Sequence, residues 1–498
     1  MAPASAAVGL PRASALRRDV QRMVDFGPRL TGSDAHNHFI DWLETEFARA
    51  GAKPLPRDEK QLVLWEAQRF GLDLLDGVGA GPIPVAAYYP RSQETGPEGI
   101  AGPLVYGGVA PTPSISPSAD PAAVAAAVAR YPSDLATWAS GLPSLAGAGA
   151  GSILLVDLPM PPALTEAFFL PMLNELVWAG HTAAELATRD YKRMLVPEVT
   201  PLPLSPFKSL GATGVVFILD ASWENLVGQY IPFLNGFQEI PALWVDRDTG
   251  ARLRLAAGTR PRARLTLTAT RRTVKTPSIV SVLPGASDEV LILNTHTDGQ
   301  NFAEENGGVA MVHLARYFGS VSRRRRLKRT LVFSAVTGHM GYDLPQTQGF
   351  IDDHPDIIKR AAAALTLEHF GCAEWLDRLA TGYHPTGDPE AFGVWTSAGR
   401  MFTETRDAAV ANAMPHTAML HGPAQFGIGG SFQNAGVPQI GAIAGPNCLV
   451  AIADNGHMDK FDAGLAARQT RWIADLLRRL DPIPASELRS GDPTLGAP

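Results

Sequence analysis

Histidine and glutamate side chains follow several hydrophobic, strand-like segments in the second half of the sequence. His296 comes shortly after the run EVLILN, His339 shortly after TLVFSAV, and Glu368 directly after ALTL. The carboxyl ends of parallel strands meet at one edge of a sheet, where ligand sites are commonly built. Imidazole and carboxylate groups suit zinc and similar divalent ions. The loop EENGG before the next helix offers Glu304 and Glu305, and the later segment NGHMD offers His457, so the sequence predicts a site for a divalent metal ion built from these side chains with His296, His339 and Glu368.

Asp298 could support this site by contacting a ligand rather than the metal ion itself. It lies two residues after His296, so on a strand both side chains would point to the same side. A carboxylate in that place could accept a hydrogen bond from the imidazole and orient it toward a metal ion.

The elements that must position these side chains alternate between strand and helix from residue 275 onward. The run EVLILN is followed by the amphipathic segment NGGVAMVHLARYF, the strand TLVFSAV, a helix near 353–361 and the strand ALTLE. Such alternation predicts an α/β fold, with a mostly parallel sheet flanked by helices. Near the start of the chain, a further helix is expected after the turn RLTGS, capped by Ser33 or Asp34.

Residues 78–265 have a different texture. Short β-rich runs alternate there with turns rich in glycine and proline, and one alanine-rich helix is expected near 121–130. We therefore expect a β-rich inserted domain at 78–265, within a discontinuous domain made of 1–77 and 266–485. The tail of 486–498, part of the apolar-poor segment after Arg479, is expected to be a surface or frayed segment.

Composition excludes several classes of protein. The 498 residues include 43 Lys and Arg against 49 Asp and Glu, so the net charge is −6, and no basic field for nucleic acid is expected. Two cysteines cannot build a disulfide framework or a zinc knuckle. The longest uncharged segment, 135–156, is interrupted by Ser, Gly and Pro, and no intact signal peptide is visible. A soluble protein without membrane contact is expected, with a cytoplasmic location favoured and the oligomeric state open.

Four motifs give the sequence a resemblance to a known family. They are RLTGSDAHNHFIDWLETEF near the start, IPALWVDRDTGARL before the strand-and-helix region, NTHTDGQNFAEENGGVA, and GHMDKFD near the end. Their types and order resemble the M28 family of zinc aminopeptidases and related hydrolases, including the versions with an inserted protease-associated domain. The resemblance implies a zinc-aminopeptidase-like fold, a protease-associated domain at 78–265, and one or two divalent ions, most simply Zn²⁺.

Residue by residue, the resemblance also implies roles for the candidate ligands. His296 corresponds to a ligand of one metal ion and His457 to the terminal ligand of the second. Glu305 corresponds to the bridging carboxylate and Glu368 to a further carboxylate, both at positions where the family usually has Asp. Gly338 and His339 align with the family's paired glutamates, the general base and a metal ligand.

The glycine at 338 changes the expected chemistry. A histidine in place of a ligand carboxylate makes the site one unit more positive, so a single metal ion becomes an alternative to two. Glu304 is then the candidate general base, because strand alternation would turn His369 to the face opposite Glu368. We expect a metal-dependent hydrolase of an amide-like bond, acting on a small amide or peptide through a metal-activated water. The alternative is a non-catalytic relative that binds a metal ion or ligand.

Overall fold

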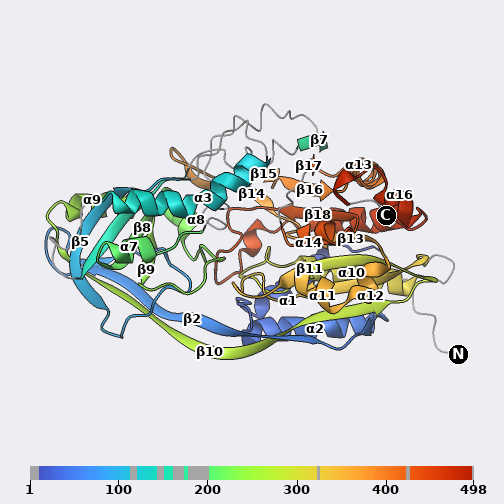
Figure 1. Cartoon of the computed structure of the whole chain (residues 1–498), viewed down its shortest axis with the longest axis horizontal. Helices are drawn as coiled ribbons and strands as arrows, with labels where there is room; N and C mark the ends of the chain where they lie inside the picture. The colour runs from blue at the N-terminus through green and yellow to red at the C-terminus, as the bar shows by residue number, and fades with distance from the viewer. Residues whose placement is uncertain are drawn as a thin grey trace.

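One long mixed β-sheet runs through both halves of the molecule (Figure 1). The structure, a computed structural model, describes residues 10–112, 121–142, 151–160, 173–177, 194, 201–321, 326–421 and 427–495. Across the sheet the strands follow the order β4 (Ala87–Tyr88), β9 (Ala242–Val245), β8 (Ala212–Leu219), β6 (Ser152–Leu158), β5 (Ile100–Val109), β10 (Arg262–Leu283), β12 (Arg329–Val336), β11 (Ser287–His296), β13 (Ala361–Leu367), β18 (Gln439–Ala444), β16 (Phe392–Thr396), β17 (Thr417–Leu420) and β7 (Leu173–Val177).

The strands that carry the candidate site are parallel to one another. β12 pairs with β11, β11 with β13, and β13 with β18, all in the parallel sense. On either side of this group, β10 pairs antiparallel with β12, and β16 pairs antiparallel with β18. The prediction of an α/β fold with a mostly parallel sheet is therefore confirmed for this half of the molecule.

Helices cover both faces of these parallel strands. One face packs against α1 (Ala13–Asp25), α2 (Asp34–Arg49), α10 (Gly307–Ser320) and α15 (Ala463–Leu480); the other packs against α11 (Gln346–Asp353), α12 (Pro355–Lys359) and α14 (Gly430–Asn434). On β11, Leu291 and Leu293 belong to the first core, whereas Val290 and Ile292 belong to the second. Alternate residues thus enter opposite cores, which is why these strands are apolar throughout.

The helices predicted from sequence are present, with shifted ends. Ser33 caps α2 by accepting a hydrogen bond from the amide of His36 at 3.2 Å, as its position before the helix predicts. The single helix expected near 353–361 is instead two short helices, α11 and α12, which meet at His354. Pro355 explains the break, because a residue before proline avoids the helical conformation.

Two long strands connect the halves of the molecule. β2 (Asp58–Leu74) pairs antiparallel with β10 along nearly its whole length, and both stretch along the lower edge of Figure 1. Beyond them, β5, β6, β8 and β9 form a second set of parallel strands. The helices α3 (Pro121–Ser140), α7 (Ser205–Ser209) and α9 (Arg247–Ala257) lie in this half.

This second half contains most of the segment 78–265. Its strands coincide with the β-rich runs of the sequence, but helices pack on them, so the arrangement is α/β. β7 also lies within 78–265, yet it pairs with β17 at the opposite end of the sheet. The inserted domain and its boundaries stay a prediction.

The C-terminal segment differs from the expectation of a surface or frayed tail. Residues 485–489 form the helix α16 (Ala485–Arg489), and Leu488 is fully buried. Arg489 donates hydrogen bonds to the carbonyls of Gly436 and Ala361. One buried leucine and one bridging arginine are enough to hold a short helix, which a count of apolar residues does not reveal.

No helix among the described residues is long and apolar enough to cross a membrane.

A buried ion cluster ties α1 and α2 to α10. Arg316 of α10 donates to Asp19 of α1 and to Glu46 of α2, both at 2.6 Å. Burial tends to raise the pKa of Asp19, but hydrogen bonds from His313 and Arg316 outweigh it and lower the pKa well below its usual range. The cluster therefore needs its cation.

We expect Arg316→Ala to lower the free energy of unfolding by about 2–4 kcal/mol, because it removes the cation that two largely buried carboxylates share and leaves them only His313 and the more exposed Arg18 and Arg49. Urea denaturation measures this. The control is Arg130→Ala, which removes an exposed ion pair with Asp134 and should cost less than about 0.5 kcal/mol. Equal denaturation midpoints for the two variants would contradict the assignment.

Candidate metal centre

Four buried side chains converge at the carboxyl ends of the parallel strands. His296 is the last residue of β11, and Glu305 lies just before α10. Glu368 and His369 directly follow β13. Each of the four is at most 1% exposed. The scaffold therefore places two imidazoles and two carboxylates together in one buried site.

The main chain fixes the orientation of both imidazoles. Nδ1 of His296 lies 2.9 Å from the carbonyl oxygen of Asp298, and Nδ1 of His369 lies 2.6 Å from that of Ala444. A carbonyl only accepts, so each Nδ1 carries the proton and donates. Nε2 is therefore the atom of each ring that can give a lone pair to a metal ion in place of a proton.

The main chain also holds both carboxylates, in each case by one oxygen. Oε1 of Glu305 accepts a hydrogen bond from the amide of Gly307, and Oε1 of Glu368 accepts one from Ile428 at 3.2 Å. Gly427 allows the second contact, because it has a φ of +88° and a Cβ there would lie 2.4 Å from Glu368 Oε1. In both glutamates Oε2 remains for another partner.

The four atoms left over are the ones that face one another. His296 Nε2 lies 3.4 Å from Glu305 Oε2 and 3.8 Å from Glu368 Oε2. His369 Nε2 lies 3.4 Å from Glu305 Oε2. Ligands of a tetrahedral zinc ion lie about 3.4 Å apart, given bonds of about 2.0–2.1 Å. The spacing therefore suits one divalent ion.

Hydrogen bonding explains why such an ion is needed. His296 Nε2, Glu305 Oε2, Glu368 Oε2 and His369 Nε2 are all buried without a hydrogen-bond partner in the structure. Buried polar atoms without partners cost free energy, and charged ones cost more. A cation at the centre would satisfy all four atoms at once, so the donor set fits a divalent ion.

The position of His369 corrects the expectation that it turns away from Glu368. His369 has a φ of +59°, so the chain leaves the extended conformation as soon as β13 ends. Strand alternation no longer applies, and both side chains enter the site. Sequence reasoning therefore missed His369 as a candidate ligand. The only signal was its place beside Glu368.

Glu304 lies beside this group of four. Its Oε1 is 3.5 Å from His369 Nε2, and both of its carboxylate oxygens are buried without a hydrogen-bond partner. Glu304 also belongs to a second group of donors, with His296 and His339, whose atoms lie within 4.8 Å of one another. The structure thus places this candidate base next to the site.

The candidate ligand His339 is held differently from the group of four. It is partly exposed, its Nδ1 lies 3.2 Å from Oε1 of Gln346, and its ring packs against that of His296 at 4.3 Å between centroids. Burial lowers the pKa of His339 to about 3, and the nearby His296 adds to this effect. The side chain is therefore neutral and able to bind a cation.

The candidate ligand His457 is the one that the structure does not bring into a donor group. Its amide donates to Oδ1 of Asn455 at 2.9 Å, in a turn at the N-terminus of η4 (Met458–Lys460). Among the described residues, neither group of three or more potential ligands includes it. Burial lowers the pKa of His457 to about 4.

Asp298 contacts two parts of the site. Its carbonyl lies next to His296, and its carboxylate binds the loop after β12. Its carboxylate accepts hydrogen bonds from the amides of His339 and Met340, at 3.2 and 2.8 Å, and from the hydroxyl of Thr31. The shorter contact of His296 Nδ1, at 2.9 Å, is with the main-chain carbonyl of Asp298, and the carboxylate that the sequence predicts as its partner lies 3.5 Å from the same atom. The carboxylate also fixes the loop that carries His339.

Gly338, the position that the resemblance assigns to the general base, has a backbone that excludes a side chain. Its φ is +102°, and a Cβ there would lie 2.4 Å from Cβ of Leu344. Only glycine adopts this conformation without strain. A glutamate at this position would require the whole loop to move.

Arg29 supports the loop that carries Glu304 and Glu305. It is fully buried and donates to the carbonyls of Asn301, at 2.7 Å, and of Glu304. Burial lowers its pKa to about 10, partly offset by the charges of Glu304 and Glu305. The sequence segment RLTGS predicts only a turn before a helix, so no local signal reveals this role.

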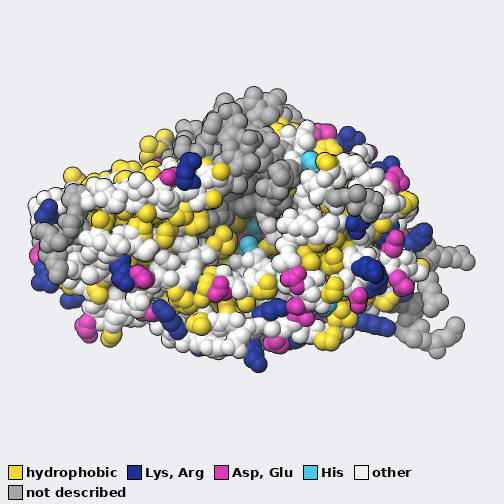
Figure 2. Space-filling model, viewed as in Figure 1, with side chains coloured by type: hydrophobic (Ala, Val, Ile, Leu, Met, Phe, Trp, Pro, Cys, Tyr) yellow, Lys and Arg dark blue, Asp and Glu magenta, His cyan; other side chains and the backbone are white. Residues whose placement is uncertain are grey.

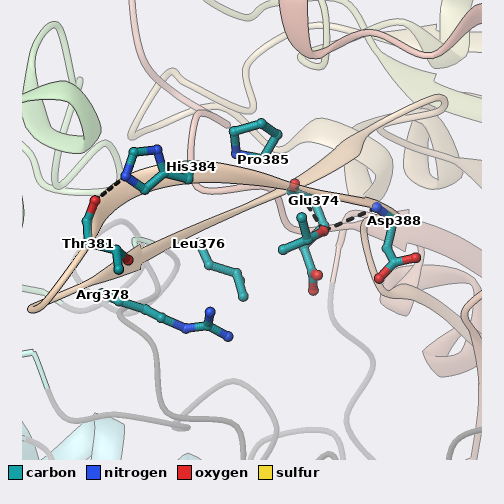
Figure 3. Close-up of a pocket in the computed structure, with 8 residues that line it drawn as sticks. Glu374, Leu376, Arg378, Thr381, His384, Pro385 and Asp388 are labelled. Atoms are coloured by element: carbon teal, nitrogen blue, oxygen red, sulfur yellow. Dashed lines mark hydrogen bonds between the residues drawn. The ribbon is translucent and has the colours of Figure 1, made fainter.

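A cavity on a β-hairpin does not share the features of the metal site. Figure 2 shows histidine side chains inside a depression near the middle of one face of the molecule. A cavity of about 400 Å³ lies on the hairpin of β14 (Ala373–Arg378) and β15 (Gly382–Pro389) (Figure 3). There the hydroxyl of Thr386 donates a hydrogen bond to the carbonyl of Glu374 and accepts one from the amide of Asp388. No described residue that lines the cavity has a buried side-chain polar atom without a hydrogen-bond partner. This cavity forms no comparable metal site.

Comparisons with known proteins bear on the fold. No protein-family model matches the sequence, and no curated protein matches it. Among solved structures, a peptidase M28 precursor from Shewanella amazonensis SB2B has a TM-score of 0.61 at 14% identity, over 94% of this chain and 96% of that one. BSAP, a zinc aminopeptidase from Bacillus subtilis, has a TM-score of 0.57 at 14% identity, over 96% and 98%. An aminopeptidase from Aneurinibacillus sp. strain AM-1 has 0.57 at 14%, over 94% of both chains. The chain thus has a zinc-aminopeptidase-like α/β fold.

The charges of the site predict how stability responds to pH. Burial lowers the pKa of His296, but its contact with Asp298 and the charges of Glu305 and Glu304 outweigh this and raise it to about 10. Burial raises the pKa of Glu305 to about 7. Both groups therefore bind more protons in the folded than in the unfolded chain. The free energy of unfolding decreases as the pH rises toward about 7 for Glu305 and toward about 10 for His296.

In chelator, we therefore expect the free energy of unfolding to decrease between about pH 6.5 and 8. Added Zn²⁺ replaces these protons, so its stabilising effect should grow over the same range. Thermal unfolding with and without the ion measures this difference. The reverse trend, or a stabilising effect of Zn²⁺ that does not change with pH, would contradict this assignment of charges.

Proposed function

We propose that this chain is a metal-dependent hydrolase that cuts an amide-like bond in a peptide or another small amide. The observation that carries the proposal is the set of four buried, unpartnered donor atoms from His296, Glu305, Glu368 and His369. Nothing else in their surroundings satisfies them, and their spacing matches that of ligands around zinc. The similar structures, two aminopeptidases and a peptidase M28 precursor, support the same class of reaction.

A bound divalent ion would supply Lewis acidity, which polarises a carbonyl and lowers the pKa of water to about 7. The protein's own contribution is to exclude bulk solvent and to place a proton acceptor beside the reacting atoms. Glu304 fits the second role, because its carboxylate is buried, has no hydrogen-bond partner and borders the donor set. It would accept a proton from the attacking water and return it to the leaving amine.

A non-catalytic protein that binds a metal ion or ligand is the second candidate. It is favoured by one observation, the backbone of Gly338, which leaves no room for a side chain at the position expected for the general base. The two candidates share the metal ion and differ only in whether Glu304 has taken over the proton transfer. Metal content tests what they share, and the rate of hydrolysis separates them.

The purified protein is expected to retain a divalent ion through dialysis, and His296→Ala to lose most of it, because this variant removes one donor of the buried set. Elemental analysis of both samples measures the ion content. His384→Ala is the matched control, since His384 is exposed and belongs to neither donor group. If the three proteins carry the same amount of metal, the donor set does not bind it.

Hydrolysis is expected with amides or esters that have good leaving groups, and to a lesser degree with ordinary aminopeptidase substrates. Glu304→Gln should lower kcat by roughly 10²–10⁴-fold, the usual contribution of a positioned general base. The metal content should stay the same, because the amide is nearly isosteric with the carboxylate. Glu98→Gln, at an exposed position, is the control. A full rate in Glu304→Gln would remove Glu304 from the mechanism. No metal-dependent hydrolysis across a broad screen would favour the non-catalytic candidate.

A further inference from the structure

We infer that the site holds a single divalent ion, bound by His296, Glu305, Glu368 and His369, and that His457 and His339 are not ligands. The inference rests on the proposed function, in that both require a metal ion at this cluster. It departs from the arrangement that the sequence motifs imply, in which His457 would bind a second ion.

The first argument is the number of lone pairs on His296. The two possible donor groups, one with Glu305, Glu368 and His369 and the other with Glu304 and His339, both contain His296. Its Nδ1 lies 2.9 Å from the carbonyl oxygen of Asp298 and donates to it, so only Nε2 can bind an ion. One lone pair binds one cation. The two groups are therefore alternatives and cannot be filled together.

The second argument is that the carboxylates are not arranged to bridge two ions. A bridging carboxylate gives one oxygen to each ion. In Glu305, however, Oε1 is engaged by the amide of Gly307, and only Oε2 faces the other donors. Glu368 repeats the arrangement, with Oε1 on the amide of Ile428 and Oε2 unpartnered. Each glutamate thus offers a single oxygen to a single point.

The third argument decides between the two alternative groups. The group with Glu305, Glu368 and His369 supplies four donors and two negative charges, which neutralise one divalent ion in a fully buried site. The group with Glu304 and His339 supplies three donors and one negative charge, and its His339 is partly exposed. An ion buried away from water is stabilised more by the neutral, four-donor arrangement.

His457 then has no role as a ligand. Neither described donor group contains it, although its Nε2 is also buried without a hydrogen-bond partner, so the choice rests on distance from the other donors. With one ion in the four-donor group, the carboxylate of Glu304 stays outside the coordination sphere. This leaves Glu304 available as a proton acceptor.

The direct test is the stoichiometry of the full-length protein reconstituted with Mn²⁺ and freed of unbound ion. Elemental analysis should give about one ion per chain, and electron paramagnetic resonance should show the six-line signal of isolated Mn²⁺. Two ions per chain, or a spin-coupled signal, would overturn the inference while leaving the proposed function standing. No bound ion would overturn both.

Variants test the choice of ligands separately. His369→Ala should weaken Mn²⁺ binding at least tenfold, whereas His457→Ala should leave affinity and stoichiometry at wild-type values. Thermal unfolding in chelator shows that both variants fold. Loss of the ion in His457→Ala, or wild-type affinity in a folded His369→Ala, would overturn the assignment.

Discussion

The cost of burying polar atoms without partners is the constraint on which this structure depends. At the carboxyl ends of β11 and β13, the main chain satisfies one side of each of four ionisable groups and leaves the other side bare. The bare atoms all face the same point, about as far apart as zinc ligands. A fold that merely tolerated these residues would pair them with each other or turn them to water. Here the four atoms lie 3.4–3.8 Å from their neighbours in the cluster without a hydrogen bond between them, which is the arrangement expected of a site made for a cation.

The surrounding scaffold explains how such a site survives folding. The strands that lead into it are buried on both faces, so packing fixes where they end. Arg29 anchors the loop of Glu304 and Glu305 by its carbonyls, and the carboxylate of Asp298 anchors the loop of His339 by its amides. Both anchors are fully buried charges that bind the main chain or a hydroxyl. The glycines at 338 and 427 permit close approaches that a side chain would prevent.

The regular part of this arrangement could be predicted from sequence, and the irregular part could not. Apolar runs of strand length, followed by an amphipathic segment, predict parallel strands and the edge where ligands gather, so His296, Glu305 and Glu368 could be found together. His369 could not, because a positive φ reverses the direction that strand alternation predicts. His457 is placed by a turn far along the chain, where short motifs say little about distance. The roles of Arg29 and of the α16 helix depend on contacts between distant segments, which no local pattern carries.

The central claim is that the four buried donors bind one divalent ion directly. X-ray absorption at the zinc edge of the Zn²⁺-loaded protein tests it, because it reports the ligands around the metal. The account predicts nitrogen and oxygen ligands at about 2.0–2.1 Å, with the outer-shell scattering of two imidazoles and no second metal nearby. A shell of water oxygens without imidazole, or a metal-to-metal signal, would contradict it.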